Sequence, residues 1–77
     1  MLKEFLEQII KQIVDNPKQI KINEVNGETI CIYELRVASG DHGKVIGKHG
    51  QNAHSIRLLL NAVAAKMNKR VILEIID

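Results

Sequence analysis

Aromatic side chains are nearly absent from this chain. Its 77 residues contain one phenylalanine, Phe5, one tyrosine, Tyr33, and no tryptophan. Proteins that stack nucleic-acid bases on aromatic rings need several such rings on one surface. The composition therefore argues against a base-stacking surface and favours contacts with bases from aliphatic side chains and the backbone.

Cysteine is equally scarce, because Cys31 is the only one in the chain. No disulfide can form within the chain, which indicates a reducing compartment and predicts a cytoplasmic location. No apolar run approaches the length of a membrane-spanning helix, and no apolar stretch of a secretory signal is visible near the N-terminus. A chain of this length predicts one small domain, 1–77, without room for a catalytic domain beside a recognition domain.

Acidic residues are missing from one long segment. Residues 1–41 contain five Lys or Arg and seven Asp or Glu, whereas residues 42–73 contain six Lys or Arg and no acid. All three histidines also fall in this second segment. A stretch without carboxylates presents a field of one sign, which favours a polyanionic partner such as a nucleic acid. The alternative is a chance split in a short chain.

The first half of the chain predicts one helix and two strands. Apolar residues recur at helical spacing over 2–14, and the helix must end before Pro17, because the residue before proline avoids the helical region. Alternation and β-branched residues predict strands over 20–23 and 30–37. The Asn-Gly pair at 26–27 is a strong signal for a tight turn between them.

The second half predicts two helices and a last strand. A short helix over 42–46 has Asp41 as its candidate N-terminal cap, a long helix covers 51–67, and a strand covers 71–76. The order of elements is therefore α-β-β-α-α-β. The long helix is expected to bury a stripe of apolar residues at helical spacing, namely Ala53, Ile56, Leu60, Val63 and Met67.

A loop bracketed by two glycines lies between the two later helices. Its sequence at 47–50 is Gly-Lys-His-Gly, and it leads directly into the long helix. Glycine has no Cβ, so the backbone at Gly47 and Gly50 can adopt positive φ and approach another molecule closely. The free N–H groups and the positive dipole end of the following helix favour an anion such as a phosphate. A plain tight turn between two helices is the alternative.

This loop and this order of elements resemble a type II KH domain. The match runs through Val-Ile-Gly-Lys-His-Gly at 45–50 and on to Ile56-Arg57, and nearly the whole chain is similar to small bacterial RNA-binding proteins with one KH domain. The resemblance implies an α+β fold with a three-stranded sheet and helices packed on one face. It also implies a non-enzymatic protein that clamps about four nucleotides of single-stranded RNA, acting as a bacterial RNA chaperone or post-transcriptional regulator.

Four side chains are candidate phosphate contacts. Lys48 and His49 belong to the loop, and Lys44 and Arg57 lie on the adjoining helices. Contacts of this kind fix the position of a nucleic acid and carry no sequence information. For Lys44 and Arg57 the alternative is a solvated surface charge. His49 departs from the resemblance, because arginine, glutamine or lysine is more usual there, and histidine changes its charge near neutral pH.

Base contacts would come from a groove beside the loop. Val45, Ile46 and Ile56 are candidates for one aliphatic wall, and an edge of the strand at 30–37 is the candidate for the other. A groove of this kind uses backbone and aliphatic contacts, so it fits the scarcity of aromatic residues. The alternative for the three apolar residues is a place in the core, wholly or in part.

The sequence does not indicate an enzyme. The glycines lack the spacing of dinucleotide-binding or nucleoside-triphosphate loops. Cys31 lies among apolar strand residues, and no His–carboxylate pair is placed to activate it. The spacing of His42, His49 and His54 does not suit a metal site. We therefore expect no catalytic residue, no metal ion, no cofactor and no small-molecule substrate.

The long helix carries more apolar residues than its buried stripe requires. Leu58, Leu59 and Ala62 lie outside that stripe and form a hypothetical dimer interface. The resemblance suggests a second copy or another KH-containing protein as the partner, and a role in partner assembly is the alternative function. The structural alternative is that a thin domain buries this helix on two sides. Pairing and RNA binding are compatible, since two clamps on one RNA raise avidity.

Overall fold

A three-stranded sheet forms one layer of the fold. The structure is a computed structural model that describes residues 2–76. Strands β1 (Lys21–Asn26), β2 (Ile30–Arg36) and β3 (Arg70–Ile76) lie in the order β1-β2-β3. β1 pairs with β2 antiparallel, and β3 pairs with β2 parallel. The central strand is therefore β2, which has a hydrogen-bonded neighbour on each side.

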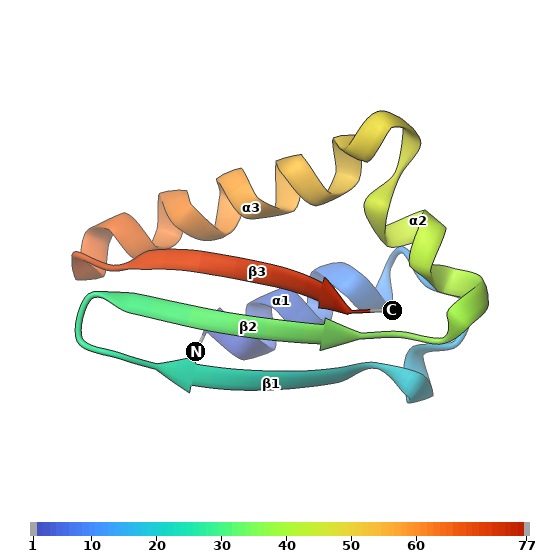
Figure 1. Cartoon of the computed structure of the whole chain (residues 1–77), viewed down its shortest axis with the longest axis horizontal. Coiled ribbons are helices and arrows are strands. Elements are labelled where there is room, and N and C mark those ends of the chain that lie inside the picture. Colours follow the sequence, from blue (N-terminus) through green and yellow to red (C-terminus); the bar gives the residue numbers. More distant parts are fainter. Residues whose placement is uncertain (1, 77) are drawn as a thin grey trace.

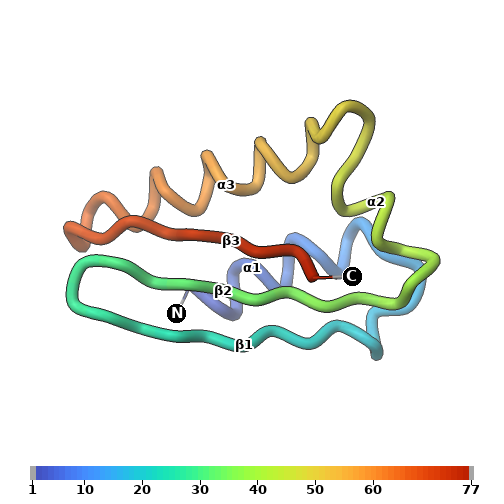
Figure 2. Tube along the Cα trace, in the orientation of Figure 1, coloured from blue at the N-terminus to red at the C-terminus, as the bar shows by residue number. Residues whose placement is uncertain are grey.

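Three helices form the second layer. They are α1 (Leu2–Lys11), α2 (His42–Ile46) and α3 (Gln51–Ala64), so the predicted α-β-β-α-α-β order and α+β class are confirmed. In Figure 1, α1 lies behind the sheet and α3 runs along β3. Parallel neighbours need a long crossover connection. The tube in Figure 2 shows that connection, in which the chain leaves β2, passes through α2 and α3, and returns as β3.

The core lies between the helices and one face of the sheet. Successive strand residues point to opposite faces, and Cys31, Tyr33 and Leu35 of β2 are buried on the helix side together with Val71 and Leu73 of β3. The helices contribute residues at helical spacing, which are Leu2, Leu6, Ile10, Ile56, Leu60 and Ala64. The other face of the sheet is open, as predicted for helices packed on one face only.

Two helix ends differ from the pattern-based prediction. α1 ends at Lys11 rather than at residue 14, because its last residues tighten into a narrower turn in which the Ile13 N–H donates to the Ile10 carbonyl. α3 tightens in the same way at Ala65–Met67. Met67, in this last turn, is 40% exposed, so the buried stripe ends at Ala64 instead.

The hairpin between β1 and β2 also differs. β1 continues to Asn26, well beyond the predicted end at residue 23. The chain reverses over Glu28 and Thr29 rather than at the Asn-Gly pair, and the Gly27 N–H donates to the Ile30 carbonyl at 2.8 Å. A Cβ on Gly27 would lie 3.0 Å from that carbonyl. Gly27 therefore permits close pairing at the base of the turn.

Candidate nucleic-acid interface

The loop at residues 47–50 has an unusual backbone. Three of its four residues adopt positive φ, with values of 77° at Gly47, 57° at His49 and 74° at Gly50. The Gly50 N–H donates to the Gly47 carbonyl at 3.1 Å, and α3 begins at Gln51 without a side-chain cap. The loop thus lies at a helix N-terminus, where the first N–H groups and the helix dipole favour an anion.

The two glycines of the loop have different surroundings. A Cβ on Gly47 would lie 2.6 Å from Asn52 Cγ and 2.8 Å from Asn52 N, closer than real atoms approach. A Cβ on Gly50 would meet nothing within 4 Å. Gly47 is therefore required by packing inside the molecule, whereas the backbone at Gly50 faces open space that another molecule can occupy.

Lys48 and His49 project from the loop into solvent. Both are exposed, and within residues 2–76 neither side chain makes a hydrogen bond or an ion pair. The positive charge of Lys48 is consequently not neutralised by the protein. This is the arrangement expected of side chains that flank a phosphate. The role of Lys48 and His49 as phosphate contacts stays a prediction.

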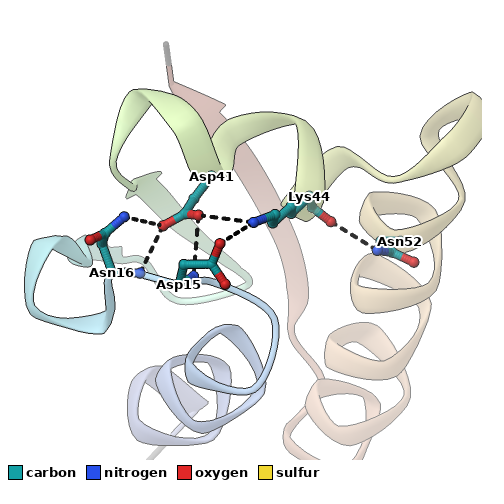
Figure 3. A network of polar contacts seen from close by, with 5 residues as sticks. All are labelled: Asp15, Asn16, Asp41, Lys44 and Asn52. Atoms are coloured by element: carbon teal, nitrogen blue, oxygen red, sulfur yellow. Dashed lines mark hydrogen bonds and ion pairs between the residues drawn. The ribbon is translucent and has the colours of Figure 1, made fainter.

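Lys44 has partners inside the protein. Its ammonium group makes a close ion pair with Asp15 and lies 3.8 Å from Asp41 Oδ1. The hydrogen bond to Asp15 raises the pKa of the Lys44 ammonium. Figure 3 shows the side chain directed toward these two carboxylates, while its carbonyl accepts a hydrogen bond from Asn52 Nδ2 at 2.9 Å. Lys44 is therefore tied to Asp15, a residue distant in sequence, as well as to the nearby Asp41.

Asp41 does not cap α2 as the sequence suggested. Its side chain makes no hydrogen bond to the first turn of that helix. It is buried, and it accepts hydrogen bonds from the backbone N–H groups of Asp15, at 3.2 Å, and Asn16, at 2.9 Å (Figure 3). Burial alone would raise the pKa of Asp41, but these hydrogen bonds outweigh burial and hold the pKa below its ordinary value of 3.8.

Arg57 also has a partner inside the protein. Its Nε and Nη2 donate to the Leu73 carbonyl at 3.2 and 3.0 Å. One turn further along α3, the Asn61 side chain accepts from the Val71 N–H at 2.8 Å and donates to the Val71 carbonyl at 3.1 Å. These side chains satisfy backbone groups on the outer edge of β3, which has no strand beyond it. Sequence reasoning missed Asn61, because nothing local marks a side chain that covers a sheet edge.

The predicted aliphatic groove needs correction. Val45 is fully buried at 0% exposure, and Ile56 is also buried in the core, so neither presents a wall. Only Ile46 of the three is partly exposed. The second predicted wall is wrong as well, because β2 is paired on both sides and β3 provides the edge near α3. Apolar type alone did not distinguish residues beneath the loop from residues beside it.

The outer surface of α3 is apolar, as the pattern indicated. Leu58 is 60% exposed and Leu59 is 45% exposed, and Ala62 is exposed as well. The core is filled by other residues of the same helix, Ile56, Leu60 and Ala64. The alternative that this thin domain buries α3 on two sides therefore does not hold for these leucines.

Within residues 2–76 no group of three or more His, Cys, Asp or Glu side chains is placed to hold a metal ion. Cys31 is a free, buried cysteine, as expected from its place in an apolar strand. No helix in this part of the chain is long and apolar enough to cross a membrane.

Sequence comparisons with known proteins match nearly the whole chain. The sequence model of the family described as "KhpA/KhpB, KH domain" matches residues 3–75. A protein of Chlamydia trachomatis named RNA-binding protein KhpA is 49% identical over 76 residues, which cover 99% of this chain and 97% of that protein. A protein of the same name from Clostridium acetobutylicum is 51% identical over 75 residues, covering 97% of this chain and all of that protein. No solved structure matches the chain significantly.

Proposed function

Because this chain belongs to the KhpA/KhpB family of KH-domain proteins, we propose that it is a non-enzymatic protein that binds single-stranded RNA with the loop at 47–50. The observation that carries this proposal is the exposed loop itself, with three positive φ angles ahead of the uncapped first turn of α3. Relatives of nearly the same length are named RNA-binding proteins. A loop of this type holds about four nucleotides.

The proposed RNA contacts differ in whether each side chain already has a partner inside the protein. Lys48 and His49 flank the phosphodiester, which lies against the backbone at Gly50, where a Cβ would meet open space. Lys44 and Arg57 contribute only if they leave their present partners. Ile46 supplies the aliphatic contact. Val45 and Ile56 support the loop from the core.

Broad rather than sequence-specific binding follows from these contacts. Phosphate contacts carry no base information, and two aromatic residues in the whole chain provide no stacking surface. Such a protein suits many RNAs, each bound weakly. This supports a role as a bacterial RNA chaperone or post-transcriptional regulator.

A second function is favoured by one observation, the exposed Leu58 and Leu59 on α3. Exposed leucines side by side on a small domain are typical of a surface that another protein covers. With Ala62 they form a candidate interface for a second copy or for another KH-containing protein. The two functions are compatible, because pairing places two loops on one RNA.

Fluorescence anisotropy with a labelled random single-stranded RNA tests the RNA-binding proposal. If about three phosphates are contacted, the slope of log affinity against log salt is about −2, so affinity falls about 16-fold between roughly 50 and 200 mM salt. The variant Lys48→Asp/His49→Asp should lose this binding while its circular dichroism spectrum stays unchanged. Salt-insensitive binding, or equal binding by both proteins, would contradict the proposal.

Two control variants test whether RNA binding depends on the loop rather than on net charge or on α3. Lys3→Asp/Gln8→Asp changes the net charge by the same amount at exposed positions on α1, and it should bind RNA nearly as well as the wild-type protein. Leu59→Lys tests the α3 surface and should change the oligomeric state, measured by sedimentation, with little effect on RNA bound per chain. Loss of RNA binding by Leu59→Lys alone would move the RNA site to α3.

A further inference from the structure

Helix α2 cannot hold its own position. It spans only His42–Ile46, and isolated helices of this length are unstable in water. The loop at 47–50 continues directly from it, so the location of the loop depends on what holds α2 in place. Contacts at the two ends of α2 provide this support.

The N-terminal end of α2 is fixed by Asp41. Asp41 is 1% exposed, and its side chain lies against the connection after α1, far away in sequence. It accepts hydrogen bonds from two backbone N–H groups, those of Asp15 and Asn16, and from Asn16 Nδ2 at 3.3 Å. A buried carboxylate with this many donors fixes the backbone around it.

The C-terminal end of α2 is fixed by Asn52, from the first turn of α3. Its Nδ2 donates to the Lys44 carbonyl at 2.9 Å (Figure 3), and that carbonyl is one of those that a helix end leaves unpaired. The same side chain fills the space beside Gly47, where a Cβ would lie 2.6 Å from Asn52 Cγ. Asn52 thus touches both the helix that precedes the loop and the first residue of the loop.

The loop needs this support because its backbone is strained. His49 is not a glycine, yet it adopts a left-handed conformation at φ 57° and ψ 27°. Gly47 at φ 77° and ψ 173° occupies a region essentially restricted to glycine. Conformations of this kind persist only where the surroundings hold them.

We propose that Asn52 is the positioning residue of the RNA-binding loop, with Asp41 fixing the opposite end of α2. This inference rests on the proposed RNA-binding function. Asn52 acts through Gly47 and the Lys44 carbonyl: it holds the loop in its binding conformation before RNA arrives. Without it the loop must be ordered at the moment of binding, which lowers affinity without removing a phosphate contact.

The variant Asn52→Ala tests this proposal. Its RNA dissociation constant should rise about three- to tenfold, the range expected for one lost hydrogen bond. The salt slope should stay at about −2, because the number of phosphates contacted does not change. In the free protein, the amide NMR signals of Gly47 and Gly50 should shift or broaden, a response that a residue contacting only RNA would not give.

Asn23→Ala is the matched control. Asn23 is also an exposed asparagine with one side-chain hydrogen bond, to Glu34 at 2.7 Å, but it lies on β1 at the open face of the sheet. The control should keep wild-type affinity within twofold and leave both glycine signals unchanged. If Asn52→Ala is poorly folded, Asn52→Leu replaces it, since it keeps a similar shape, lacks the N–H donor and adds no charge beside the RNA.

The outcomes separate this inference from the proposed function. Wild-type affinity and unchanged glycine signals in Asn52→Ala, while Lys48→Asp/His49→Asp loses binding, would overturn the positioning role and leave the loop as the RNA site. A shallower salt slope in Asn52→Ala would also overturn it, because Asn52 would then act on a phosphate contact. No salt-sensitive binding by the wild-type protein would overturn the proposed function, and this inference with it.

Discussion

The loop at 47–50 and the helix that leads into it, α2, contain the same sequence pair with different consequences. Each has a glycine followed by a lysine. Lys48 has no partner within residues 2–76, whereas Lys44 is held by Asp15 and Asp41. A Gly-Lys pair therefore indicates a phosphate contact only where the lysine has no carboxylate neighbour, and that neighbour can come from a distant part of the chain.

The glycines at the start of each pair show the opposite contrast. Gly47 has positive φ and lies against Asn52, whereas Gly43, inside α2, has ordinary helical φ and open space where a Cβ would be. Gly50 combines positive φ with open space. The loop at 47–50 thus differs in exposure from its support, by which we mean α2 together with Asp41 and Asn52. Gly47 belongs with the packed and hydrogen-bonded groups that hold the loop, whereas the side chains of Lys48 and His49 and the Cα of Gly50 face open space.

The largest effect is expected at Gly47. Gly47→Ala places a Cβ against Asn52 in a backbone region restricted to glycine, so it should lower the free energy of unfolding by about 3 kcal/mol or more. Gly50→Ala carries only the cost of its left-handed backbone, about 1 kcal/mol. Urea unfolding of both variants measures the difference. Equal losses would show that Asn52 moves aside easily, which would remove the distinction between the two glycines.

The next effect is expected at Asp41 and depends on pH. The folded-state pKa of this carboxyl lies below 3.8, so its stabilisation is fully present above that pH and is lost as pH falls through the folded-state pKa. Asp41→Asn should lower the melting temperature at neutral pH by roughly 5–10 °C. The difference from wild type should shrink when thermal melts are repeated below pH 3.8. A difference that stays constant with pH would mean that the charge of Asp41 is not what stabilises α2.

The sequence predicted the order of elements and the place of the loop, because both follow from local patterns. Hydrophobic periodicity separates helices from strands, and paired glycines ahead of an amphipathic helix mark the loop. The support was not predictable in the same way. Asp41 contacts Asn16 across 25 positions of sequence, and no periodicity connects them. Local reasoning assigned Asp41 to the nearest helix start, where aspartate is common.

The segment without acids illustrates the same limit. Residues 42–73 carry no carboxylate in sequence, yet the fold brings Asp15 to Lys44. Burial was equally hidden, because Val45 and Ile46 are both apolar and adjacent, and only the structure shows that Val45 lies in the core. The position of the loop could be predicted from the sequence, whereas contacts made by folding could not.

A third prediction compares the two lysines directly. Lys48→Gln should make the salt slope of RNA binding shallower by about 0.7, the contribution of one phosphate on a single strand. Lys44→Gln should leave the slope unchanged, because its ammonium group is already neutralised by carboxylates. Anisotropy titrations over a series of salt concentrations provide the measurement. A shallower slope in Lys44→Gln would show that Lys44 leaves Asp15 for the RNA, and would return it to the phosphate contacts.

The smallest effect is expected at Gly43, where the change in the free energy of unfolding should have the opposite sign to the change at Gly47. Gly43→Ala adds a helix-forming residue inside α2, at ordinary φ and with nothing within 4 Å of the new Cβ. It should raise the free energy of unfolding by about 0.5–1 kcal/mol, the reverse of the change at Gly47. RNA affinity should stay the same or rise slightly, since a firmer α2 holds the loop better. Destabilisation by Gly43→Ala would show that α2 needs a flexible residue at this position. It would contradict the description of α2 as a rigid support for the loop.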